Sequence, residues 1–175
     1  MFVGAYWSQR RESMEAASAR LASFLKALSE QRADLSKWYR KAGSRDAALR
    51  SVLTPDGASI VGELKPSRRD VDRQPIPELG FAFAAWNGAE ASLSAQIGAW
   101  SPYVRNAVVL NLGSGVRLGE DSSRALLEAL VRAFDPDHAV VTSHEHLAKA
   151  GVTNPWEAGL FTYQRGGRIE KHPFE

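Results

Sequence analysis

Apolar residues recur along this chain at helical spacing in two places and at strand spacing in several others. At three- and four-residue intervals they share one face over residues 12–30 and again over residues 121–134, which predicts two helices. The Asp135-Pro136 pair ends the second of them, because the residue before a proline is disfavoured in helical conformation.

Shorter apolar runs predict β-strands. Residues 91–100 alternate apolar with small polar positions, which is typical of a strand with one face in water. The Asn87-Gly88 pair predicts a hairpin that joins this strand to residues 80–86. Because strands follow strands more often than they alternate with helices, we predict an α+β fold, with a mostly antiparallel or mixed sheet and two main helices packed on one face. The other predicted strands are residues 2–7, 107–112, 139–143 and 159–164.

The segments between these elements are less regular. Residues 34–53 predict a turn that carries Trp38, followed by a short helix from Arg45 to Leu53. Residues 54–78 contain four prolines and predict a long irregular loop, a feature that is often functional in a compact domain. Neither flank of this loop is complete alone, so we expect residues 1–175 to form a single domain.

Composition excludes several classes of protein. The chain has no cysteine, which excludes disulfides, thiolate nucleophiles and cysteine-based metal sites. No secretory signal begins the chain and no run approaches the roughly 18 apolar residues of a membrane span, so we expect a cytoplasmic protein with no membrane partner.

Charge is unevenly distributed. Residues 1–53 hold ten Lys/Arg and five Asp/Glu, whereas residues 54–175 hold twelve and fifteen, for a net charge of +2. The basic first third would suit a nucleic acid or an acidic partner, although a solvated helix face and a charged loop are the simpler explanation.

Two segments resemble sites for ligands. Residues 113–119 are glycine-rich and lie between a predicted strand and a predicted helix, where a phosphate-binding loop belongs. The third glycine comes one residue late, however, and Glu120 and Asp121 would repel a phosphate. His144-Glu145-His146 could chelate a metal, but it matches no recognised zinc spacing and a polar turn explains it. No G-x-S-x-G elbow is present.

The chain is poor in catalytic motifs and rich in residues that dominate binding interfaces. It has five tryptophans, and Trp, Tyr and Arg carry most hot spots. We therefore predict a binding protein that is not an enzyme and has no cofactor and no metal. Two alternatives remain open, a nucleic-acid-binding module and a small metal-dependent enzyme that uses His144, Glu145 and His146.

An ordered set of short segments resembles the immunity protein 52 family of bacterial polymorphic toxin systems. The set spans nearly the whole chain. Its members are Ala5-Tyr6-Trp7, Trp38-Tyr39-Arg40-Lys41 with Ser44-Arg45 and Ala48-Leu49, Arg68-Arg69-Asp70, Leu79-Gly80-Phe81, Trp86-Asn87-Gly88, Asn106 to Leu110, Phe134-Asp135-Pro136 and Gly159 to Tyr163.

This resemblance implies a protein that protects its own cell by binding a nuclease toxin of restriction-endonuclease-like fold. It further implies that an adjacent gene encodes the toxin and that a contact-dependent, type VI secretion system delivers it. No direct nucleic-acid partner is expected. The residues that we predict to contact the toxin are Trp38, Tyr39, Arg40, Lys41, Arg68, Arg69, Glu120 and Asp121.

Overall fold

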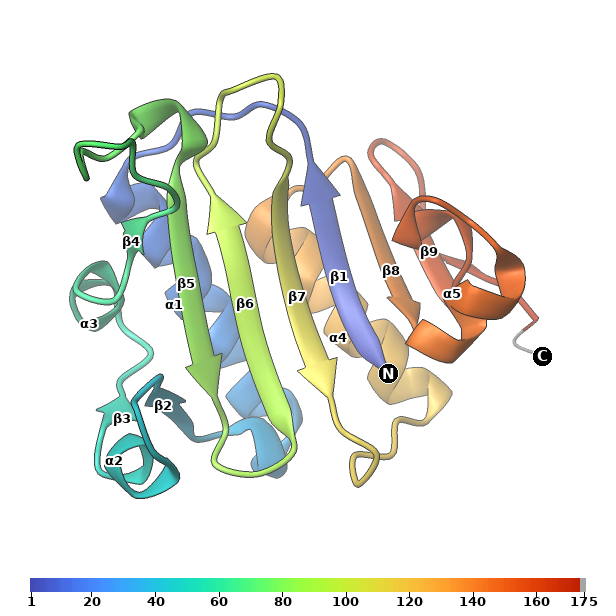
Figure 1. Ribbon diagram of the computed structural model, residues 1–175. Helices are drawn as coiled ribbons and strands as arrows, with labels where there is room; N and C mark the ends of the chain where they lie inside the picture. The colour runs from blue at the N-terminus through green and yellow to red at the C-terminus, as the bar shows by residue number, and fades with distance from the viewer. Residues whose placement is uncertain (174–175) are drawn as a thin grey trace.

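One antiparallel β-sheet organises the computed structural model, which describes residues 1–173 of the chain. Of the ten strands formed by those residues, nine follow the order β10-β9-β8-β1-β7-β6-β5-β2-β3 (Figure 1). The tenth, β4, pairs with the start of β5, whereas β2 pairs with its end. The strands are β1 (Phe2–Trp7), β2 (Trp38–Arg40), β3 (Val52–Leu53), β4 (Lys65–Pro66), β5 (Phe81–Trp86), β6 (Ala91–Ile97), β7 (Asn106–Leu112), β8 (His138–Thr142), β9 (Phe161–Gln164) and β10 (Glu170–Lys171).

Two long helices cover one face of this sheet. They are α1 (Met14–Gln31) and α4 (Glu120–Phe134), which lie behind the strands in Figure 1 and pack against each other. The α+β class is therefore confirmed. The expectation of two main helices covers only part of the helical structure, because residues 1–173 also form α2 (Arg45–Leu49), α3 (Gly57–Val61) and α5 (His144–Ala150).

The core lies between the sheet and these two helices. The Ser13 side chain caps α1 by accepting the backbone N–H of Ala16 at 3.2 Å, and the apolar stripe that follows faces the strands. Phe134, at the end of α4, stacks on Trp7 at 5.8 Å between ring centroids and meets Phe24 edge-on at 5.7 Å. This aromatic group joins β1 to both helices.

Along the central strands, side chains alternate between the face covered by the helices and the open face. Burial alternates residue by residue along β6 and β7, so every second side chain points away from the helices. The β5–β6 hairpin forms as predicted. Asn87 Oδ1 accepts the N–H groups of Ala89 and Ala91 at 3.0 and 2.8 Å, and Gly88 adopts a φ of +85°.

Three expectations for the less regular segments were wrong. The predicted turn around Trp38 is strand β2, which extends the sheet by pairing with β3 and β5. The helix that begins at Arg45 ends at Leu49, before β3. The segment 54–78 is not irregular throughout, because Asp56 caps the short helix α3 by accepting the Ser59 N–H at 2.8 Å, and β4 follows.

Candidate functional site: the open face of the sheet

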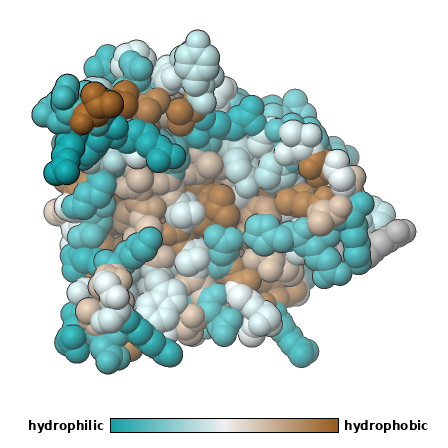
Figure 2. Space-filling view, viewed as in Figure 1, coloured by the Kyte–Doolittle hydropathy of each residue, from teal (hydrophilic) through white to brown (hydrophobic). Residues whose placement is uncertain are grey.

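The face of the sheet opposite α1 and α4 carries mostly small side chains at its centre. Strand register places one residue from each of six neighbouring strands in a single row across this face, and each member is glycine, alanine, serine, threonine or valine. The row comprises Ala84, Ser94, Val109, Gly4, Val140 and Thr162. Figure 2 shows pale and brown residues in the middle of this face, with mostly teal residues around them.

We call the open-face residues of β5, β6 and β7, Trp86 excepted, the floor. They are Ala82, Ala84, Ser92, Ser94, Gln96, Ala107, Val109 and Asn111. None of them is charged, and Ala84, Ser92 and Ser94 are exposed. A surface of short, uncharged side chains can receive another protein with little loss of side-chain entropy.

One end of the floor is bounded by an aromatic pair with an arginine. Tyr39 on β2 lies beside Trp86 on β5, with 6.3 Å between ring centroids, and the Arg45 guanidinium lies 5.8 Å from the Trp86 ring. Trp86 is held in place because its indole N–H donates to the Ala89 carbonyl at 3.0 Å. A cavity of about 310 Å³ adjoins this pair, and its lining includes Arg40, Lys41, Arg45 and Trp86.

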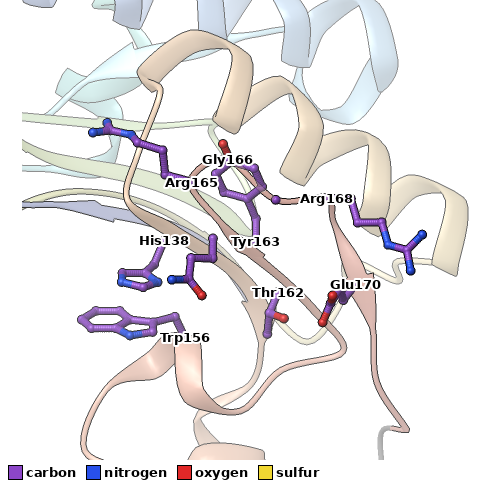
Figure 3. A pocket seen from close by; sticks show the side chains of 10 residues that line it. His138, Trp156, Thr162, Tyr163, Arg165, Gly166, Arg168 and Glu170 are labelled. Atoms are coloured by element: carbon purple, nitrogen blue, oxygen red, sulfur yellow. The ribbon is translucent and has the colours of Figure 1, made fainter.

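The other end is bounded by a second aromatic group around Trp156. His138 stacks on the Trp156 ring at 4.9 Å and 10°, Tyr6 contacts it at 5.1 Å, and the Arg105 guanidinium lies 4.6 Å from it. Both rings line a cavity of about 450 Å³, together with Arg165 and Arg168. Figure 3 shows the His138 and Trp156 rings side by side on this lining. Each end of the floor therefore presents a tryptophan with an arginine over its ring.

Tyr6 lies flat across the sheet between the floor and this second group. A Cβ on Gly4 would stand 2.6 Å from the Tyr6 hydroxyl, so only glycine at position 4 leaves room for the ring. Burial raises the pKa of Tyr6 to about 12. Within residues 1–173 the Tyr6 hydroxyl has no hydrogen-bond partner, which leaves a polar atom for an approaching molecule.

The predicted contact residues in β2 and directly after it have different environments. Trp38 lies in the core with 3% of its surface exposed, and its indole N–H donates to the Leu35 carbonyl at 2.9 Å. Tyr39 faces the open side. Arg40 forms an ion pair with Glu63 at 2.7 Å, whereas Lys41 is exposed.

The remaining predicted contact residues lie elsewhere in the molecule. Arg68 and Arg69 follow β4, where Arg69 donates to the Arg73 carbonyl at 2.7 Å. Glu120 and Asp121 begin α4, and Glu120 pairs with Lys171 at 2.6 Å. The structure therefore places the eight residues in three separate regions (Figure 1).

The structure shows the surroundings of the two segments that resembled ligand sites in the sequence. His144, Glu145 and His146 lie in the first turn of α5, where residues two apart point to different sides of a helix. Among residues 1–173 no three His, Cys, Asp or Glu side chains are grouped so that they could hold a metal ion. The Glu90 carboxylate lies against Gly113 and Gly115, where it would oppose a phosphate.

Arg45, Arg105, Trp156 and Tyr6 were not among the contact residues predicted from the sequence, although Tyr6 and Arg45 lie in segments that carry the family resemblance. These residues come together only through the pairing of particular strands. That pairing cannot be read from a single sequence. The one available signal was strand alternation, because Tyr6 and Trp7 must point to opposite faces of β1.

The hydrophobicity of the helices and two comparisons with known proteins indicate what kind of protein this is. No helix formed by residues 1–173 is long and apolar enough to cross a membrane. No curated protein matches the chain. The family model for Immunity protein 52 matches residues 1–164, a range that includes every residue of the floor. The chain therefore belongs to the immunity protein 52 family.

Proposed function

We propose that this protein binds and neutralises a cognate nuclease toxin. The observation that carries the proposal is the family match over residues 1–164, since immunity proteins act on a partner toxin. The open face supports a binding role, because it combines an uncharged floor with aromatic and arginine side chains at both ends.

The distribution of charge favours inhibition by steric occlusion, or by holding the toxin inactive, over mimicry of DNA. A nuclease binds a polyanion, so a mimic needs a continuous acidic surface. Several of the acidic groups in residues 1–173 are neutralised by ion pairs within the chain, which interrupts such a surface. Asp135 and Asp137 pair with Arg165 at 3.4 and 3.0 Å, and Glu145 pairs with Lys149 at 3.1 Å.

The setting that we propose is the cytoplasm of the producing bacterium, where the protein protects the cell and its kin. The toxin would be encoded by the adjacent gene and delivered between cells by a type VI secretion system. Complete protection requires tight binding. A nanomolar complex corresponds to about −12 kcal/mol and commonly buries about 800 Å² on each partner.

Co-purification with the product of the adjacent gene, followed by calorimetry and a DNA-cleavage assay, tests this function. We expect a one-to-one complex of nanomolar affinity that abolishes cleavage at stoichiometric protein. Heat-unfolded protein is the control for non-specific inhibition. A toxin that binds but does not cleave nucleic acid would remove the nuclease part of the proposal, and absence of binding would remove all of it.

A further inference from the structure

We propose that the toxin docks on the open face of the sheet, and that it brings carboxylate groups to Arg45 and Arg105 at the two ends of the floor. This inference rests on the proposed function and adds the surface and the chemistry of the partner. The face behind the strands is covered by α1 and α4, and the β8 part of the opposite face is buried, so the floor is the part of the sheet that another molecule can reach (Figure 1).

The charge on this face is the first argument. Arg45, Arg105 and Lys41 have no carboxylate within ion-pair distance among residues 1–173, and the floor carries no acidic residue. Several other arginines of the protein are neutralised internally, such as Arg40 by Glu63. Unpaired cations around an uncharged centre match an acidic partner.

The way these arginines are held is the second argument. Each lies over a tryptophan ring, Arg45 over Trp86 at 5.8 Å and Arg105 over Trp156 at 4.6 Å. An arginine stacked on an aromatic ring has lost part of its rotamer freedom before it binds, and its planar fork matches a carboxylate in two hydrogen bonds. Both pairs therefore have the composition and the preorganisation of hot spots.

The size of the face is the third argument. Strands in a sheet lie about 4.8 Å apart, so the three intervals from β5 to β1 span about 14 Å. That width accepts an element about as thick as an α-helix, roughly 10–12 Å with its side chains. The toxin would thus place one element over Ser94 and Val109, where small side chains permit close approach.

A second surface competes with this one. The loop between β6 and β7 carries Tyr103, which is 94% exposed, and the loop between β4 and β5 carries Val71, which is 97% exposed. Residues at loop tips must be ordered on binding, which costs affinity. The residues of the floor are already fixed by the strands, so we place the main contact there.

Calorimetry of the toxin with purified variants of the full chain tests the inference. We expect R45E and R105E each to weaken binding about 10-fold, and the double variant about 100-fold, because each replaces attraction by repulsion. S94W should weaken binding about 100-fold by filling the floor. For the wild type, raising NaCl from about 50 to 500 mM should weaken binding, and the double variant should lose most of that salt dependence.

Matched controls lie on the helical layer. R132E on α4 and A19W on α1 make the same changes at exposed positions, and we expect less than about a 3-fold change in affinity. Thermal unfolding of every variant verifies that it is folded.

Three results would overturn the inference. If folded R45E/R105E and S94W bind like the wild type, the toxin does not dock on the open face. If Y103A abolishes binding while these variants do not, the loop end is the interface. If the wild type itself does not bind, the proposed function fails first.

Discussion

The carboxylate of Glu12 lies 2.9 Å from the guanidinium of Arg10, and only 6% of the Glu12 side chain is exposed. Arg20 approaches the same carboxylate at 3.2 Å. Both arginines also donate to carbonyls at the end of α4, Arg10 to that of Phe134 at 2.6 Å and Arg20 to that of Ala133 at 3.0 Å. Glu12 thus holds two cations where they satisfy the unpaired carbonyls of a helix C-terminus.

We expect Glu12→Gln to lower the free energy of unfolding by about 2–3 kcal/mol, because it leaves two neighbouring guanidinium groups with only the exposed carboxylate of Asp135, 3.9 Å from Arg10, as a counter-charge. Urea denaturation followed by circular dichroism measures the change. Glu128→Gln, which breaks the exposed pair with Arg124 at 3.8 Å, should cost no more than about 0.5 kcal/mol. Equal effects of the two variants would contradict the role given to Glu12.

Substitution of Trp38 distinguishes a role in the protein core from a role in the toxin interface. We expect Trp38→Phe to cost about 1–2 kcal/mol of stability, since it removes buried area and leaves the Leu35 carbonyl without its 2.9 Å donor. Toxin affinity of the folded variant should change less than about 3-fold. Trp100→Phe, at a position 41% exposed, is the control and should change stability by no more than about 0.5 kcal/mol. A large loss of toxin affinity with unchanged stability would show that Trp38 contacts the toxin.

The sequence predicted those elements whose signals are local. The Asn87-Gly88 turn is specified by its own residues, and the stripes of α1 and α4 repeat within each helix. Strand β2 was missed because three residues are a strand only through their pairing with β3 and β5. The same reason hid β4, whose two residues pair with Ala82 and Phe81.

The candidate site was harder to predict than the fold. Trp156 and Tyr6 are 150 positions apart, and they meet only because β1 lies beside β8. Trp38 and Tyr39 share one motif in the sequence, yet strand alternation sends the first into the core and the second to the open face. Composition identified residue types suited to binding, whereas strand register decides which of them are available.

Tyr6 provides a test in alkaline solution. Burial raises its pKa to about 12 from an ordinary value of 10.0, so the folded state disfavours the phenolate. The resulting stability is fully present below pH 10 and is lost as pH rises towards 12. We expect Tyr6→Phe to reduce the alkaline loss of stability, measured by urea unfolding across this pH range. Tyr103→Phe, at a position 94% exposed, should leave the profile unchanged. An unchanged profile for Tyr6→Phe would mean that the ring is hydrated.

Asp137 contributes to the change in folding stability at acidic pH. Burial alone would raise its pKa, but hydrogen bonds from the Ser8 N–H at 2.7 Å and the Ser8 hydroxyl at 2.6 Å, with the charges of Arg165 and His138, lower the pKa below 3.8. A carboxylate whose folded pKa is depressed stabilises the protein above its unfolded pKa, and this contribution disappears as pH falls through the folded value.

We therefore expect Asp137→Asn to cost about 1 kcal/mol at neutral pH, a small value because the side chain is partly hydrated. The difference from the wild type should shrink as pH falls below the ordinary carboxyl pKa of 3.8, as the wild-type carboxylate becomes protonated. Thermal unfolding from neutral to acidic pH measures it. Ser8→Ala should reproduce part of the loss in the wild type and add little in the Asp137→Asn background, because both changes break one contact that ties the end of β1 to the start of β8. Additive effects of the two substitutions would show that Ser8 and Asp137 act on stability independently.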